Sequence, residues 1–207
     1  MTELQTKTQN QGPPSSGRSK LTTFLTFALL ALSAGPAATQ SGASADPRLE
    51  YKVKAAYLYN FAKFVEWPAH AFKGPADPIV FAVLGKDPFG DVLESTFENK
   101  TIGGRPCTVK RFSTLEEVKD CHVLFLGSSL DKEIAKAIPF LKGKPTVTVG
   151  EAESFTSVGG MIRLFLKENK VHFEINIDSA KAEGIKVSSQ LLKLGKVVGD
   201  KANSAGK

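Results

Sequence analysis

The sequence predicts an α/β protein of three layers, in which a mostly parallel sheet has helices on both faces and ends in an antiparallel hairpin. Three observations support this fold class. Continuous apolar runs at residues 79–84 and 122–126 are typical of strands that are buried on both faces. Segments with helical spacing alternate with these runs along the chain. The last third instead contains two neighbouring apolar strands with a short polar connection, which indicates a hairpin.

The first 45 residues differ from the rest and predict a signal peptide. A polar stretch ends in Arg18 and Lys20, and the apolar run that follows, residues 21–34, is shorter than the ~20 residues of a membrane-spanning helix. Ala-Ser-Ala at 43–45 offers a cleavage site before Asp46. An uncleaved anchor or a short buried helix is the alternative. We expect a single domain over residues 46–198, a flexible tail over 199–207, and export to the periplasm.

Composition and charge describe an ordinary globular protein. The 207 residues are 42% apolar and 23% charged, with a formal net charge of +6 and two cysteines. These values exclude a disulfide-dense miniprotein and a disordered acidic tail. The predicted signal peptide contains three basic residues and one acid, so its removal lowers the charge from +6 to +4. The remaining Lys and Arg are scattered among acids, and we expect no nucleic-acid partner.

An amphipathic helix is predicted over residues 49–67. Its apolar positions recur at steps of three to four residues and are Val53, Ala56, Tyr57, Phe61, Phe64 and Val65. Pro68 ends the helix, because the residue before a proline is biased away from helical geometry. A loop over residues 69–78 leads to the first buried strand, residues 79–84.

The next segment repeats the strand and helix pattern. Asp87 followed by Pro88 predicts the start of a helix. The side chains that this helix would turn inward are Phe89, Val92, Leu93 and Phe97. The elements expected after it are a strand at 107–112, a short helix capped by Ser113 or Thr114, a strand at 122–126, a helix at 131–141 and a strand at 146–149.

The final elements are the hairpin and a terminal helix. Strands at 161–166 and 171–177 are joined through residues 167–170, where Asn169 suits a turn. A helix at 189–198 follows, capped by Ser188 or Ser189.

The chemistry of the sequence does not indicate an enzyme. A strand-to-helix loop with Gly85, Lys86, Asp87 and Gly90 is a candidate ligand loop, but it matches neither common phosphate-binding motif, and an ordinary capped turn is the favoured interpretation. The three histidines have no metal-ligand spacing, and no G-x-S-x-G motif is present. We therefore expect no catalytic residue, metal or cofactor.

Cys107 and Cys121 are a candidate disulfide, because an oxidising compartment favours pairing. A bridge that closes about 15 residues would contribute roughly 3 kcal/mol. If the sheet order is 2-1-3, however, the strands of the two cysteines lie about 9.6 Å apart, which is too far for a bridge within the sheet. A disulfide and two buried thiols both stay open.

Aromatic residues near the first helix suggest a surface for a partner protein. Trp67 and Phe72 lie in or beside a proline-bounded loop, where exposure and burial are equally compatible with the sequence. Together with His172 on the predicted hairpin, they are the candidate partner-binding residues.

Six motifs in order give the chain a family resemblance. They are YKVKAAYLYNFAKFVEWP at 51–68, VLGKDPFG at 83–90, CHVLFL at 121–126, GGMI at 159–162, VHFEINI at 171–177 and IKVSSQLLKL at 185–194. Over residues 49–198 the sequence resembles the YfiR-like family, which is also catalogued as a domain of unknown function.

The resemblance implies a periplasmic repressor without catalytic activity. Such a protein binds the sensory domain of an inner-membrane diguanylate cyclase and lowers cyclic-di-GMP synthesis. The resemblance also implies an OmpA-like outer-membrane lipoprotein that sequesters the repressor, and modulation by redox state and homodimerisation. The alternative from another class is a periplasmic module that binds a small molecule, beside the loop at 85–90 or under the hairpin.

Overall fold

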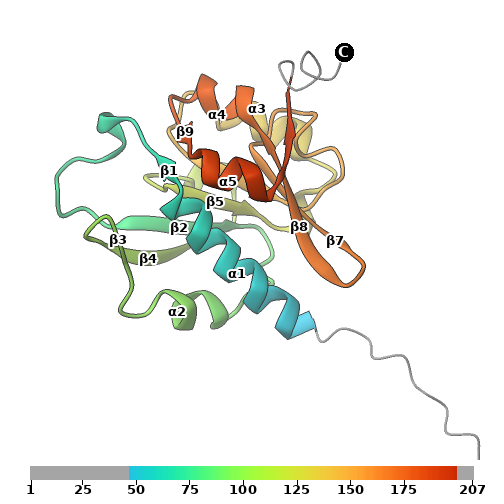
Figure 1. The fold of residues 1–207 in the computed structure, drawn as a ribbon, viewed down its shortest axis with the longest axis horizontal. Helices are drawn as coiled ribbons and strands as arrows, with labels where there is room; N and C mark the ends of the chain where they lie inside the picture. The colour runs from blue at the N-terminus through green and yellow to red at the C-terminus, as the bar shows by residue number, and fades with distance from the viewer. Residues whose placement is uncertain (1–46, 200–207) are drawn as a thin grey trace, which may run out of the picture. The chain divides into compact units, whose positions relative to one another are not determined.

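The structure is a computed structural model that describes residues 47–199. The predicted signal peptide and residues 200–207 of the predicted tail lie outside the described residues. One sheet of eight strands forms the centre (Figure 1). In spatial order its strands are β10 (Lys196–Val198), β8 (Lys170–Asn176), β7 (Ile162–Lys167), β6 (Val147–Gly150), β5 (Val123–Leu126), β2 (Ile79–Leu84), β4 (Arg105–Phe112) and β3 (Thr101–Ile102).

The strands are mostly parallel, as the sequence predicts. Antiparallel pairs occur within this sheet at β3–β4 and at the hairpin β7–β8, and the other neighbours run parallel. A small second sheet pairs β1 (Val65–Glu66) with β9 (Lys186–Val187) in antiparallel register. The order β4-β2-β5 is the 2-1-3 arrangement considered from the sequence.

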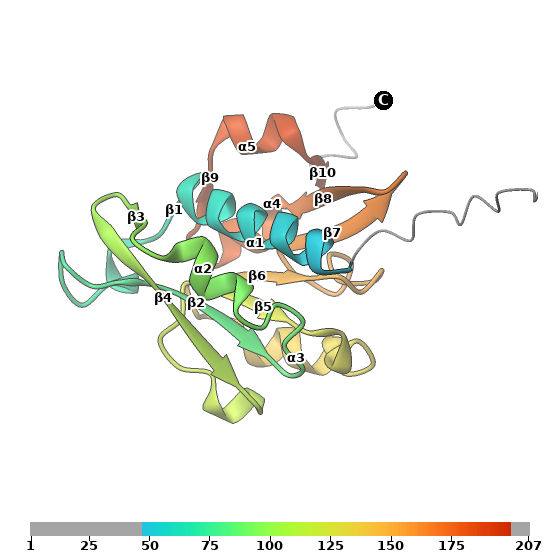
Figure 2. The same ribbon diagram turned by 90° about the horizontal axis from the view of Figure 1, so that it is seen from below.

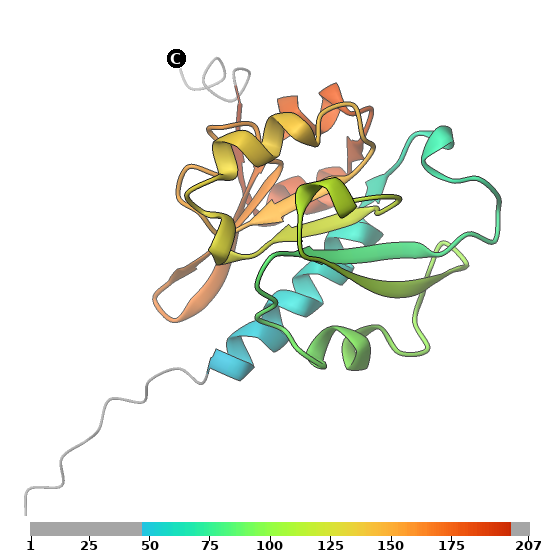
Figure 3. The same cartoon turned by 180° about the vertical axis from the view of Figure 1, so that it is seen from behind.

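Helices cover both faces of the sheet, so the three-layer fold class is confirmed. The helices that contribute to the larger core are α1 (Pro47–Lys63), α2 (Val92–Phe97), α4 (Ile177–Ala182) and α5 (Ser189–Leu194). Figure 2 shows α1 between α2 and α5 on this face. On the opposite face α3 (Ile134–Phe140) packs on a second core (Figure 3). Short 3-10 helices occupy connections and are η1 (Ala69–Ala71), η2 (Leu115–Glu117) and η3 (Ser128–Leu130).

The buried strands explain why the sheet forms where the sequence predicts it. All residues of β2 and β5 are buried, since each strand has a core on both faces. Phe81 of β2 stacks on Phe97 of α2 with ring centres 4.1 Å apart, and Phe89 meets Phe125 of β5 edge-on at 4.9 Å. These aromatic contacts fix α2 and the preceding loop against the sheet.

Several element boundaries differ from the sequence prediction. The first helix ends at Lys63, because the chain then extends into β1 to pair with β9. The second begins at Val92, whereas Asp87 accepts a hydrogen bond from the Phe89 N–H at 2.7 Å and so caps a turn. The third begins at Ile134, three residues after the predicted start.

The predicted terminal helix is wrong in its second half. It ends at Leu194, and residues 196–198 form β10, which pairs with β8. Gly195 allows this change of direction, because a Cβ there would lie 2.2 Å from the ring of Phe173. The N-cap is Ser188, one of the two residues expected, and its hydroxyl accepts from the Gln190 N–H at 3.1 Å.

The hairpin β7–β8 extends beyond its neighbours in the sheet. Its turn is formed by Glu168 and Asn169, whose φ angles of 51° and 58° match a type I′ turn. Among the described pairings, β6 reaches β7 at Ile162 and Arg163. Within the described residues, the half of the hairpin nearest its turn therefore has no strand beside it other than the two strands of the hairpin itself. Within residues 47–199, no helix is long and apolar enough to span a membrane.

Candidate functional site

The candidate ligand loop lies at a point in the sheet where the connections from two neighbouring parallel strands lead in opposite directions. It follows β2, beside the loop after β5, and from these strands the chain continues to β4 on one side and to β6 on the other. Open parallel sheets bind ligands at such a point, outside the carboxyl ends of the strands. Here the two loops touch, since the Lys86 N–H donates to Ser129 Oγ at 3.0 Å and a Cβ on Gly127 would lie 2.4 Å from the Lys86 carbonyl oxygen.

Several polar groups of this loop are engaged within the protein. Arg111 pairs with Asp87 at 2.6 Å, donates to the Gly90 carbonyl at 2.6 Å and bonds Glu94 at 2.5 Å. These contacts lower the pKa of Glu94, chiefly through its hydrogen bond with the guanidinium. Gly85 has a φ of +83°, and a Cβ there would meet Ser129 Oγ at 2.6 Å. The four candidate residues lie in one loop, and the contacts of that loop hold it to the rest of the protein. A ligand at this loop stays a prediction.

Trp67 and Phe72 form an aromatic stack with His122. The Phe72 and His122 rings are 4.5 Å apart with an interplanar angle of 17°, and Trp67 meets both rings edge-on. The Arg105 guanidinium lies 3.8 Å from the centre of the Phe72 ring. Both aromatic side chains are half-buried, so the stack closes the 69–78 loop on the sheet.

His122 is held in its neutral form by two backbone groups. Its Nδ1 accepts from the Val80 N–H at 3.1 Å, so Nε2 carries the hydrogen and donates to the Ala71 carbonyl at 3.1 Å. Burial lowers the pKa of His122 further below its ordinary value, because the charged ring would lose water. This histidine therefore locks the loop to the strand rather than serving a metal.

His172, the third partner-binding candidate, is exposed on the hairpin. It stacks on Phe165 of β7 with ring centres 5.8 Å apart. It is the exposed one of the three candidates, and it lines a groove between α1, the hairpin and the end of α5 that we call the apolar groove. The structure therefore does not bring His172 together with Trp67 and Phe72.

The apolar groove lies between α1, the hairpin β7–β8 and the end of α5, and has a volume of about 540 Å³. Four of its lining residues are large apolar side chains that are exposed: Leu49 (61%), Val53 (39%), Leu166 (46%) and Leu194 (72%). Figure 1 shows that the three elements converge there. Exposed apolar side chains that gather in one recess mark an interaction site.

The sequence prediction for the faces of α1 is wrong at this surface. Val53 and Ala56, expected on the inward face, are exposed. The side chains that face the core are Ala55, Leu58, Phe61 and Ala62, and a lysine, Lys54, is buried with them. The helix is apolar on two faces, and the apolar spacing alone does not distinguish them.

Buried charges fix α1 beside the groove. Lys54 is 3% exposed and its ammonium pairs with Glu50 and Glu151. The same ammonium lies 4.4 Å from the centre of the Tyr51 ring, and the Tyr51 hydroxyl donates to Glu151 Oε2 at 3.2 Å. Burial and the neighbouring carboxylates raise the pKa of Tyr51. Glu50 also lines the groove, so this cluster sets the position of one wall.

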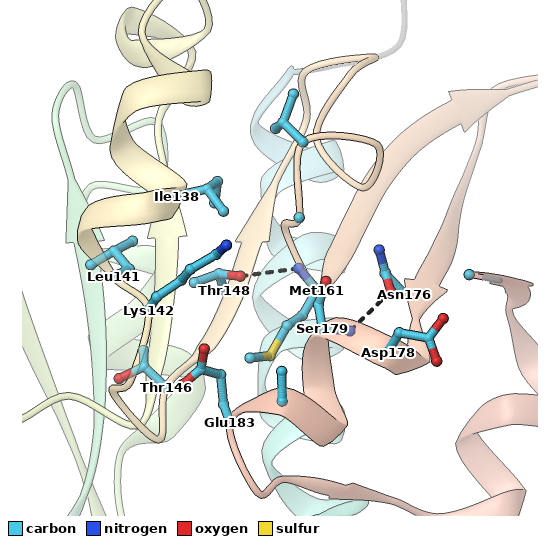
Figure 4. Close-up of a pocket in the computed structure, with 14 residues that line it drawn as sticks. Ile138, Leu141, Lys142, Thr146, Thr148, Met161, Asn176, Asp178, Ser179 and Glu183 are labelled. Carbon is cyan, nitrogen blue, oxygen red and sulfur yellow. Dashed lines mark hydrogen bonds between the residues drawn. The ribbon is translucent and has the colours of Figure 1, made fainter.

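A second cavity, of about 320 Å³, lies between the end of α3, β6 and the start of α4 (Figure 4). Lys142 lies on one wall, and Asp178 and Glu183 come from the α4 side. Several of its polar groups already have partners, since Thr148 Oγ1 accepts from the Met161 N–H at 3.0 Å. The cavity therefore combines charges of both signs with a polar floor.

Cys107 and Cys121 are separate thiols in the structure. Cys107 pairs with Ile79 on one side of β2, and Cys121 precedes β5 on the other. Two strand spacings separate them by about 9.6 Å, beyond the reach of a disulfide. Burial raises the pKa of Cys121 to about 11 and also raises that of Cys107. Of the two alternatives left open from the sequence, the structure has the unbridged one.

Comparison with protein families identifies the chain. Residues 51–196 match the model of a family described as YfiR/HmsC-like. The chain belongs to the YfiR/HmsC-like family. Membership of this family indicates a periplasmic regulator of diguanylate cyclase signalling, and the six motifs quoted from the sequence all lie within the matched region. Within residues 47–199 of this YfiR/HmsC-like chain, no group of three or more His, Cys, Asp or Glu is arranged to hold a metal ion.

Sequence reasoning missed most of the groove. Leu49, Leu166 and Leu194 come from three distant segments, and each reads as an ordinary apolar position in its own helix or strand. One local signal existed, since Leu166 lies directly beside the polar turn of the hairpin, where a core side chain is unusual.

Proposed function

We propose that this protein is a non-catalytic regulator that binds the periplasmic sensory domain of an inner-membrane diguanylate cyclase and lowers cyclic-di-GMP synthesis. Membership of the YfiR/HmsC-like family over residues 51–196 carries the proposal. The proposed system includes a cleaved signal peptide over residues 1–45, a homodimer, and an OmpA-like outer-membrane lipoprotein that relieves repression.

Repression of this kind requires binding but no reaction at the regulator. The regulator binds the inactive conformation of the sensory domain more tightly than the active one and so shifts the population. A hundredfold shift needs a difference in binding free energy of about 2.7 kcal/mol. Two or three well-buried apolar contacts supply this magnitude. The apolar groove offers four exposed apolar side chains for such contacts.

Deletion of the gene tests the proposal. We expect cyclic-di-GMP and biofilm to rise in the deletion strain and to return to the wild-type level when the full chain is supplied. A tagged full chain should also recover a diguanylate cyclase from membranes. If cyclic-di-GMP is unchanged on deletion and no cyclase is recovered, the proposal is wrong.

A periplasmic small-molecule-binding module is the second candidate, and the cavity of about 320 Å³ in Figure 4 favours it. This volume lies at the lower end of the ~300–1,000 Å³ range of ligand sites. The charges of Lys142 and Glu183 suit a small zwitterion such as an amino acid. Binding would raise the melting temperature with ligand concentration. A flat response across amino-acid, nucleotide and vitamin panels would exclude this candidate.

A further inference from the structure

The loop between β1 and β2, residues 67–78, lies on the surface of the protein. Figure 1 shows it projecting at the left of the view before the chain returns into β2. None of its residues is buried. Its tip is a turn of its own, because Asp77 Oδ2 accepts from the Lys73 N–H at 2.6 Å and from the Gly74 N–H at 2.8 Å. The loop can therefore move as a unit, and its movement uncovers no fully buried side chain of its own.

Two side chains beside the sheet hold backbone carbonyls of this loop. His122, directly before β5, donates from Nε2 to the Ala71 carbonyl oxygen at 3.1 Å. Arg105 of β4 donates to the carbonyl oxygens of Gly74 and Asp77 at 2.8 and 2.9 Å. Arginine keeps its charge throughout the physiological pH range, whereas histidine changes its charge within it. The hydrogen bond from His122 is therefore the one that pH can break.

The position of the His122 ring is incompatible with a second proton. Its Nδ1 accepts from the Val80 N–H at 3.1 Å, so a proton on Nδ1 would face another donor. The main chain of His122 is fixed, since its N–H donates to the Val80 carbonyl oxygen and its carbonyl oxygen accepts from the Val147 N–H, both at 2.8 Å. Because the strands cannot yield, a protonated ring must turn out of this site and give up its bond to Ala71.

The aromatic side chains of the loop pack on the ring that must turn. The Phe72 and His122 rings stack 4.5 Å apart, and Trp67 meets His122 edge-on at 5.7 Å. The Arg105 guanidinium lies 3.8 Å from the centre of the Phe72 ring, so a protonated His122 would add repulsion between two cations. Among residues 47–199, the indole N–H of Trp67 is buried without an acceptor, and an open loop would expose this donor to water.

The charged groups around His122 act in both directions. Burial lowers the pKa of His122 most strongly, and the charge of Arg105 lowers it further. The hydrogen bond to Ala71 and the carboxylates of Asp120 and Asp77 act in the opposite direction. The other charged or titratable side chains at this site are His70, Lys73, Lys119, Cys121 and Lys144. The net effect lowers the pKa, so the ring is neutral in the closed loop at neutral pH.

We propose that residues 67–78 form an acid-released flap: a proton from solvent binds His122 at Nδ1, both side-chain hydrogen bonds of the ring break, and the loop swings off the sheet. Trp67 and Phe72, which the closed loop keeps half-buried, become exposed in the released state. The apolar surface of the protein then differs between neutral and acid conditions. This inference concerns the chain alone and does not rest on the proposed function.

Tryptophan fluorescence of the purified full chain tests the proposal, because Trp67 is the one tryptophan in the sequence. From pH 7.5 to pH 4.5 we expect its emission to shift to longer wavelength and acrylamide to quench it more strongly, while the far-UV circular dichroism is unchanged. The Val80 amide loses its acceptor on release. Its hydrogen exchange, measured by NMR and corrected for the intrinsic rate, should become faster by up to about tenfold for each pH unit below ~6.5, until the closed form is protonated as well.

Substitution of the histidines identifies the group that titrates. The sequence contains three, and His70 and His172 are both exposed. His122→Gln should abolish the pH dependence of the emission wavelength. The double variant His70→Gln and His172→Gln keeps His122 as its one histidine and should retain the wild-type transition. Arg105→Gln should move the transition to higher pH, because the loop loses two hydrogen bonds and the ring loses a neighbouring cation.

The outcomes separate release of the loop from other effects of acid. The proposal is overturned by an emission wavelength that does not change with pH, by a shift that persists in His122→Gln, or by a shift that is lost in the double variant. Loss of circular dichroism in step with the fluorescence change would show global unfolding and would overturn it too. If His122→Gln does not fold, the double variant decides, since it retains His122 and lacks the other two histidines.

Discussion

Replacement of Lys54 by Met tests whether the buried charges hold α1 on the sheet. The Lys54 side chain is 4% exposed, and its ammonium pairs with Glu50 one turn earlier and with Glu151 after β6. Met keeps most of the length and the packing of the alkyl chain but removes the positive charge. Glu50 and Glu151 then stay close together without the cation that compensates them.

The expected cost is about 2–3 kcal/mol at pH 7. Removal of one partner from a fully buried ion pair costs ~3–5 kcal/mol. The Glu50 and Glu151 side chains are 19% and 18% exposed, so water screens part of the penalty. At about 2–4 °C per kcal/mol for a domain of this size, the melting temperature should fall by roughly 4–12 °C.

Thermal unfolding followed by circular dichroism at pH 7 measures the effect. Lys52→Met is the control, since Lys52 is exposed on the same helix and its replacement should change the free energy of unfolding by less than ~0.5 kcal/mol. A deficit of Lys54→Met below 1 kcal/mol would refute the role given to the charges.

Three further predictions concern His122, the contact between the two loops and the thiols. Burial lowers the pKa of His122, so as the pH falls the unfolded chain binds a proton at this histidine before the folded chain does; the contribution of neutral His122 to stability is complete above pH ~6.5 and declines below it. His122→Asn should therefore make the melting temperature depend less on pH between pH 7 and pH 5.5. An unchanged pH dependence would contradict the neutral state given to His122. Gly127→Ala should cost about 1–3 kcal/mol in chemical denaturation, since its Cβ would lie 2.4 Å from the Lys86 carbonyl oxygen. Ellman's reagent should detect both thiols in unfolded protein without added reductant. In folded protein it should react with Cys107 before it reacts with the buried Cys121. If neither thiol reacts after unfolding, the two cysteines form a disulfide instead.

The two central strands could be predicted because each is a run of consecutive apolar residues. Residues 79–84 and 123–126 are continuous apolar runs, and a strand with a core on both faces requires such a run. β10 could not be predicted in this way, since Lys196–Val198 is short and half-exposed and its pairing depends on Gly195, which fits against the ring of Phe173. Tertiary contact, rather than local propensity, decides that segment.

The partner surface is harder to predict than the fold because exposure is a property of assembled elements. Trp67 and Phe72 have the composition of a binding site, yet His122 and Arg105 pack on them. Leucines attract less notice in a sequence, although Leu194 is 72% exposed once α5 ends and the chain turns into β10. Only the three-dimensional arrangement distinguishes an aromatic side chain in a stack from an aliphatic one at a surface.

The two faces of α1 connect stability with the proposed regulation. Its inner face supplies Leu58 and Phe61 to the core, and its outer face presents Leu49 and Val53 in the apolar groove. Lys54 lies at the boundary, where its contact with Glu151 fixes the rotation of the helix. A change on the inner face should therefore lower stability and repression together, whereas Val53→Glu should lower repression alone. A variant of the outer face that reduced both would indicate that this face is required for folding, and its role in the proposed regulation would then be wrong.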